Sequence, residues 1–254
     1  CLLLLACHAR WTWLETGSTR ARRWEWVFFL LGFGALELHV VYPAIAAALT
    51  LLYHRERWRD IPPLFAVAAV YAVFNRMIAR PAGGSVYKLH WDTDIFATLG
   101  TYVRMASGIW HPELYREAEK QWLAVEWLLG AAAVAAAIWF LRQRDRWAAF
   151  GLVWFLAVLA PVLPLKNHIS PYYLTVPVIG LAFAVGPLVV RRPWFAVAPA
   201  LLYVAATGYW SRRTVDYNCE RAETARVLFE GVREAAELHP GKAILLTLVS
   251  SEQY

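Results

Sequence analysis

The chain has 254 residues, of which 59% are hydrophobic and 17% are charged, whereas about 25% of the residues of an ordinary soluble domain are charged. This composition is typical of an integral membrane protein rather than of a soluble globular domain. The net charge of +6 does not indicate nucleic-acid binding, because the basic residues lie in short segments between apolar runs, where membrane topology accounts for them.

Long apolar runs dominate the chain. A helix needs about 20 apolar residues to cross the roughly 30 Å of hydrocarbon in a bilayer, and six runs approach or exceed that length. We therefore expect an all-α, polytopic bundle of membrane-spanning helices. The apolar segment CLLLLAC at the start resembles the end of one more span, as if the chain were part of a longer protein. The six expected spans are residues 25–53, 61–79, 122–141, 148–165, 172–190 and 194–210.

Glu37 and His39 lie inside the first of these runs, in GALELHVVYPAIAAALTLLY. An acidic residue at the centre of a membrane helix costs about 2.5 to 3.5 kcal/mol, so a compensating interaction is expected. Two interpretations stay open: Glu37 locks two helices together through a hydrogen bond, or both side chains line a buried polar cavity. Pro43 cannot donate to the helical hydrogen bonds and is expected to kink the span.

His90, Asp92 and Asp94 lie within five residues of one another in YKLHWDTDIF, between the second and third runs. Carboxylates and a histidine this close suit a divalent cation or a general base. The alternative is a capped helix start, since the glycine and the downstream ligands of a calcium loop are missing. A helix lying along the surface is expected from Asp94 onward.

Lys166, His168, Tyr172 and Tyr173 follow the fourth run, in PVLPLKNHISPYYLTVPVIG. Prolines between residues 161 and 171 break helical structure, so these side chains are expected on a short stiff turn. A lysine and a histidine beside tyrosine hydroxyls can hold a phosphate or pyrophosphate headgroup through charge-assisted hydrogen bonds. The alternative is a basic and aromatic membrane anchor.

Arginines indicate an orientation. Three short segments on one side of the expected bundle hold eight arginines in sixteen positions, which predicts that this side is cytoplasmic. The tail after Trp210 is then extracytoplasmic, in a multi-pass protein of the inner membrane. Arg20, Arg22 and Arg23 contradict this orientation, because they lie on the opposite side. The three segments are residues 54–60, 142–147 and 191–193.

The pattern changes after residue 210. Apolar residues recur at three- and four-residue steps up to His239, which predicts an amphipathic helix that ends at His239-Pro240-Gly241. The apolar segment AILLTLV, residues 243–249, is expected to form a buried strand. We therefore divide the chain into a transmembrane domain, residues 1–210, and the start of a small extracytoplasmic α/β domain, residues 211–254.

Two motifs resemble a known family. An apolar helix that ends in Pro-x-x-Pro, a polar turn containing Asn167-His168, and YY-x-x-x-P-x-x-G are similar to a late stretch of GT-C superfamily glycosyltransferases that use polyprenyl-phosphate sugars, nearest to the bacterial mannosyltransferase-like branch. The spacing from Glu37 to Pro43 is also similar, although Leu36 stands where the family often has lysine.

The resemblance implies transfer of a sugar from a polyprenyl-phosphate donor to an extracytoplasmic acceptor, with membrane lipid as the other partner. It also implies that the catalytic carboxylate lies upstream of Cys1, and that Lys166 and His168 serve the departing phosphate. Asp92 or Asp94 would hold a metal or the acceptor. The alternative functions are a secondary transporter or flippase, in which Glu37 and His39 relay protons, and a non-catalytic scaffold.

Overall fold

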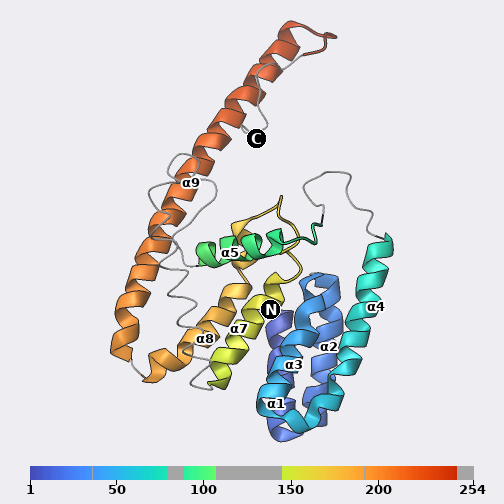
Figure 1. Cartoon of the computed structure of the whole chain (residues 1–254). Helices are drawn as coiled ribbons and strands as arrows, with labels where there is room; N and C mark the ends of the chain where they lie inside the picture. The colour runs from blue at the N-terminus through green and yellow to red at the C-terminus, as the bar shows by residue number, and fades with distance from the viewer. Residues whose placement is uncertain (36, 79–88, 107–144, 192, 245–254) are drawn as a thin grey trace.

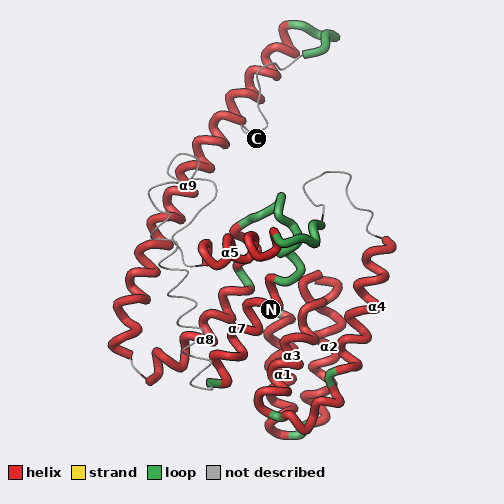
Figure 2. The backbone as a smooth tube through the Cα atoms, viewed as in Figure 1, coloured by secondary structure: helices red, strands yellow, loops and turns green. Residues whose placement is uncertain are grey.

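The computed structural model describes residues 1–35, 37–78, 89–106, 145–191 and 193–244, and most of these residues are helical (Figures 1 and 2). The N-terminal part contains four α-helices and two short 3-10 helices among the described residues. In chain order they are α1 (Leu2–Thr16), α2 (Thr19–Ala35), η1 (Glu37–Val41), α3 (Tyr42–Tyr53), η2 (Arg55–Asp60) and α4 (Pro62–Ile78).

Helices α1 and α2 form a tight antiparallel hairpin. Gly17 ends α1 in the left-handed conformation, with φ of 70°, and its N–H donates to the carbonyl of Trp13 at 2.8 Å. Only glycine adopts this conformation at little cost. Arg20, Arg22 and Arg23, which the sequence placed outside the expected spans, therefore lie at the start of α2, and Arg22 pairs with Asp60 of η2 at 2.6 Å.

The expected span at residues 25–53 is broken in the middle. Helix α2 ends at Ala35, and α3 begins at Tyr42 with Pro43 in its first turn. Proline is tolerated in the first turn of a helix, where its missing N–H would have no partner. Instead of one kinked helix, the structure therefore has two α-helices, α2 and α3, connected by the short 3-10 helix η1.

The second half of the described chain is built around the pair α7 (Arg146–Leu159) and α8 (Pro177–Arg191). The two helices approach closely at Gly151 and Gly180, because a Cβ atom added to Gly180 would lie 2.5 Å from the carbonyl oxygen of Gly151. Helix α3 packs on α7 and joins this pair to the N-terminal helices. Around the pair lie α5 (Asp94–Ala106), η5 (Pro171–Leu174) and the long α9 (Pro193–Leu238).

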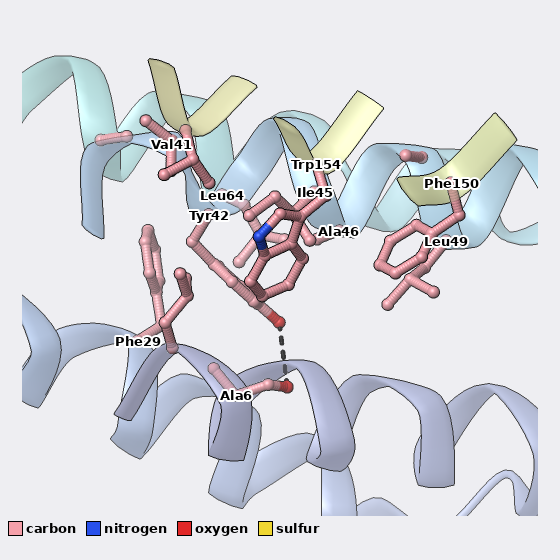
Figure 3. Close-up of a cluster of buried hydrophobic side chains, with 14 of the residues drawn as sticks. Ala6, Phe29, Val41, Tyr42, Ile45, Ala46, Leu49, Leu64, Phe150 and Trp154 are labelled. Atoms are coloured by element: carbon pink, nitrogen blue, oxygen red, sulfur yellow. Dashed lines mark hydrogen bonds between the residues drawn. The ribbon is translucent and has the colours of Figure 1, made fainter. Parts of the chain in front are cut away.

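Aromatic and aliphatic side chains from α1, α2, α3, α4 and α7 make the larger core (Figure 3). Tyr42 and Phe29 are fully buried in it, and Trp154 reaches into it from α7. A smaller core joins α5 to the end of α7 and to η5, with Tyr102, Leu159 and Leu174 at its centre. This smaller core places the polar segments before α5 and after α7 next to each other.

The prediction of a membrane-spanning bundle is wrong for the part of the chain that the structure describes, where no helix is both long and apolar enough to cross a bilayer. The apolar runs are cut at prolines and turns, so α3, α4, α7 and α8 have 12, 17, 14 and 15 residues. A 17-residue helix is about 26 Å long, short of the roughly 30 Å required.

Helix α9 has 46 residues, but eleven charged residues lie between positions 211 and 238. The finding on helix length and polarity also contradicts the predicted multi-pass localisation in the inner membrane with an extracytoplasmic tail. The expected span at residues 122–141 lies outside the described residues.

The predicted α/β tail was also wrong as far as the structure describes it. Helix α9 runs without a break from Pro193 to Leu238, so the expected boundary at residue 210 falls inside one helix. It ends at the predicted place, before a turn in which Gly241 has φ of 80°. No strand occurs in the described residues, and the expected strand at 243–249 lies mostly beyond them (Figure 2).

Candidate functional site

Two groups of polar residues that the sequence presented as separate sites meet in the structure. The segment before α5 and the turn after α7 lie side by side, and their side chains form one exposed cluster on the smaller core. We call it the Lys166 cluster. Its members are His90, Asp92, Asp94, Lys166, Asn167, His168 and Tyr172.

Lys166 is the centre of this cluster. Its Nζ atom lies 3.0 Å from Asp92 Oδ2 and 2.5 Å from Asp94 Oδ2, within hydrogen-bonding distance of both. The lysine side chain is 29% exposed, and the two carboxylates are 45% and 53% exposed. One ammonium group therefore bridges two carboxylates at the surface, across more than seventy positions of sequence.

Asp92 lies two residues before the start of α5. Its Oδ1 atom accepts a hydrogen bond from the backbone N–H of Asp94 at 3.1 Å, and its carbonyl accepts from Ile95 at 3.3 Å. An aspartate side chain that accepts an N–H group of the first turn stabilises a helix start. Asp92 thus has both roles that the sequence offered as alternatives: it accepts a hydrogen bond at the helix start, and it belongs to the polar cluster.

The backbone holds the two segments in register. The N–H of His90 donates to the carbonyl of Pro164 at 2.9 Å, and the N–H of His168 donates to the carbonyl of Leu165 at the same distance. The side chains of Asn167 and His90 add a contact of 3.4 Å. The expected stiff turn is present, and it is fixed by proline, by local hydrogen bonds and by contact with the segment before α5.

Aromatic rings surround the cluster. The His168 ring lies 3.4 Å from the Tyr172 hydroxyl and packs edge-on against Tyr173, while Tyr172 and Tyr173 are 4.2 Å apart between ring centres. Trp91 stands between two members of the cluster in sequence and is 77% exposed, and Phe96 is 75% exposed. The Tyr172 hydroxyl thus contacts a member of the cluster, and Trp91 adjoins two members in sequence.

The ion pairs stabilise the charged forms of their members. The hydrogen bond from Lys166 holds the pKa of the Asp92 carboxyl below its ordinary value, and the hydrogen bonds to Asp94 and Asp92 raise the pKa of Lys166. Burial raises the pKa of the nearby Tyr102 hydroxyl, so it stays neutral. At neutral pH the two carboxylates and one ammonium carry a net charge of about −1.

A metal site was one expectation for His90, Asp92 and Asp94. Within the described parts of the chain, no group of three or more histidine, cysteine, aspartate or glutamate side chains is arranged to hold a metal ion. The Lys166 ammonium occupies the position between the two carboxylates that a cation would need.

The other candidate pair, Glu37 and His39, falls in η1. The side chain of Glu37 lies outside the described residues. His39 is buried and packs against Gly32 of α2, so closely that a Cβ atom there would overlap the imidazole ring. The structure thus gives His39 a place in helix packing.

The sequence reading missed a buried ionic network between α1, α2 and α3. Arg10 Nη1 lies 3.1 Å from Glu25 Oε1, and its Nε and Nη2 atoms donate to Thr50 Oγ1 at 3.2 and 2.7 Å. The Tyr42 hydroxyl donates to Glu25 at 2.8 Å. The sequence contained a signal for this network: Arg10 and Glu25 are charged residues next to tryptophans, where a buried charge needs a partner.

This network is closed to solvent. Arg10 is 1% exposed and Glu25 is fully buried, and Arg10 also lies over the Trp13 ring at 4.8 Å. Burial raises the pKa of Glu25, although Arg10 and the Tyr42 hydroxyl favour its ionised form. Burial likewise raises the pKa of the neighbouring Cys7 thiol. These groups join three helices and offer no surface to a ligand.

No family model, no curated protein and no solved structure matches this chain. The resemblance to GT-C glycosyltransferases therefore remains a hypothesis drawn from two short motifs. The geometry of the Lys166 cluster is the feature from which a function can be argued.

Proposed function

We propose that the Lys166 cluster binds a sugar, and that the chain contributes this site to the transfer of a sugar from a polyprenyl-phosphate donor to an acceptor. One observation carries the proposal. A single ammonium group on a surface turn, held between the carboxylates of Asp92 and Asp94, gives a set of hydrogen-bond donors and acceptors with a net charge of about −1.

A small net negative charge favours a neutral ligand with many hydroxyl groups over an anion, which it would repel. Sugar hydroxyls can donate to Asp92 and Asp94 and accept from Lys166 and Asn167 in the same small area. A phosphate would need the Lys166 charge, which the two carboxylates already compensate. The role of Lys166 expected from the sequence, as a phosphate ligand, is therefore revised to that of a sugar ligand.

The exposed aromatic rings support the same choice. Trp91 and Tyr172 are 77% and 59% exposed beside the polar centre, and an aromatic face can stack on the C–H face of a sugar ring. Large amphipathic rings at a polar site provide contact area at low entropic cost. In the transfer reaction, Asp92 and Asp94 would hold hydroxyl groups, and His168 would face the departing phosphate.

The test is a calorimetric titration of the full chain with farnesyl-phosphoryl mannose, methyl mannoside and farnesyl phosphate. We expect the two mannose compounds to bind at one site. Replacing Asp94 by asparagine should weaken their binding about tenfold, because a hydrogen bond to a charged group contributes about 1.5 to 3 kcal/mol. Asp216→Asn, which changes an exposed aspartate of α9, is the matched control and should leave binding unchanged.

The proposal fails if Asp94→Asn binds both mannose compounds as the unaltered chain does. It also fails if farnesyl phosphate binds as tightly as farnesyl-phosphoryl mannose, since the phosphate would then be the recognised group. None of the contacts among the described residues favours a transporter or a flippase, so we propose no second function.

A further inference from the structure

A shallow groove of about 420 Å³ runs along the seam between α1 and α2. One face of each helix lines it, with positions three and four residues apart in α1 and in α2. The lining residues belong to the α1–α2 hairpin, whereas the Lys166 cluster belongs to the segments at the start of α5 and after α7; Figure 1 shows α5 apart from this hairpin. Among its lining residues are Leu5, Thr12, Ser18, Arg20, Trp24 and Phe28.

The groove is polar at one end and apolar at the other. Ser18 and Arg20 lie near the turn between the helices, and Leu5 and Phe28 each lie about three helical turns away, toward the opposite end of the hairpin. Trp24 stacks on Phe28 with 5.4 Å between ring centres, and it is 46% exposed. The wall is therefore an apolar surface that leads to a basic end.

Carboxylates near this basic end already have partners. Asp60 accepts from Arg22 at 2.6 Å, Glu15 lies 3.3 Å from the His54 ring, and Glu25 is buried with Arg10. Residues 1–78 contain eight arginines and five acidic residues.

Arg20 and Arg23 consequently form no ion pair with any residue that the structure describes. Both side chains are exposed. The basic end of the groove has a surplus positive charge, which complements an anion.

We propose that this groove binds a phospholipid with an anionic headgroup, whose hydrocarbon chain lies along Leu5, Trp24 and Phe28 and whose phosphate contacts Arg20. The apolar length of the groove selects an amphiphile, and the unpaired arginine selects a negative headgroup. The site explains the basic cluster at Arg20 and Arg23 that membrane orientation did not explain. It is independent of the sugar site.

The test uses two soluble short-chain lipids, dihexanoylphosphatidylglycerol and dihexanoylphosphatidylcholine, titrated into the full chain by calorimetry. We expect the anionic lipid to bind about fivefold more tightly, the effect of one basic residue on an anionic lipid. Arg20→Gln should remove this preference. Arg233→Gln, which changes an exposed arginine of α9, should retain it.

A second variant tests the apolar end. Leu5 is 43% exposed, so Leu5→Gln should fold and weaken the binding of both lipids while keeping the preference. Leu201→Gln in α9, where the leucine is 65% exposed, is its control. Equal binding of the two lipids, a preference that survives Arg20→Gln, or inorganic phosphate binding as tightly as the anionic lipid would each overturn the proposal.

Discussion

Replacing Glu25 by glutamine should destabilise the chain strongly, because it leaves the Arg10 charge buried without its counter-ion. Arg10 is 1% exposed and lies 3.1 Å from the Glu25 carboxylate. Glutamine has nearly the same size as glutamate, so the change removes charge and leaves the packing in place. The measured loss therefore reports the ion pair.

The contacts of Arg10 and Glu25 determine how much free energy of unfolding is lost in Glu25→Gln. Breaking a buried ion pair on one side costs about 3 to 5 kcal/mol. After the change, Arg10 keeps its two hydrogen bonds to Thr50 and its position over the Trp13 ring. These remaining contacts place the expected loss near the lower end, at about 3 kcal/mol.

The assay is chemical denaturation followed by circular dichroism, with the unaltered chain under the same conditions. Glu234→Gln, an exposed position of α9, should change the free energy of unfolding by less than about 0.5 kcal/mol. The double variant Arg10→Met, Glu25→Leu should recover most of the loss, since apolar groups often replace buried ion pairs without cost. A loss below about 1 kcal/mol for Glu25→Gln would refute the reasoning.

Two further changes test the packing of α7 on α8 and the Lys166 cluster. Gly180→Ala should lower the free energy of unfolding by about 1 to 3 kcal/mol, because the new Cβ atom would lie 2.5 Å from the Gly151 carbonyl oxygen. The control is Gly231→Ala, where the site is open; it should be neutral or stabilising by up to about 1 kcal/mol. An equal effect of the two changes would contradict the close approach of α7 and α8. Lys166→Met should raise the pKa of Asp92 toward its ordinary 3.8, since the lysine hydrogen bond is the main cause that lowers it. The stabilisation from Asp92 is therefore present at neutral pH and is lost as pH falls through the lowered pKa. The measurement is a carbon NMR titration of the Asp92 carboxyl. The same titration midpoint in Lys166→Met and in the unaltered chain would disprove the role of Lys166 in lowering this pKa.

Local signals predicted several features correctly. The helix that begins at Asp94, the helix end before His239 and the stiff turn around Lys166 all occur where short-range patterns placed them. Each depends on residues within a few positions of one another, such as the aspartate that caps α5 or the prolines that end a helix. Such features need no knowledge of the rest of the fold.

The lengths of the helices could not be predicted by counting apolar residues. The run at 25–53 is apolar enough to look continuous, but a new helix begins there at Tyr42, with Pro43 in its first turn. The prolines after Leu159 likewise separate α7 from α8. A hydropathy average extends over many residues, whereas a proline acts on the backbone at one position. A segment can therefore look like one long apolar run in the sequence and still form two short helices in the structure.

The site was only half predictable, because its two halves are far apart in the chain. Asp94 and Lys166 are separated by 72 positions, and nothing in the residues between them requires that they meet. Their contact follows from the smaller core, in which Tyr102 and Leu174 join α5 to η5. The sequence singled out both groups of polar residues, but it did not indicate that one lysine would pair with two carboxylates.

This pairing also determines which residue can separate binding from stability. Asp92 caps α5 as well as holding Lys166, so any change there would weaken the helix and the cluster together. Asp94 holds Lys166 through Oδ2 alone, and its Oδ1 atom accepts no hydrogen bond from any described residue. Asparagine at position 94 keeps one oxygen for Lys166 while removing the charge. A loss of sugar binding in that variant, without loss of α5, would therefore come from the ligand site itself.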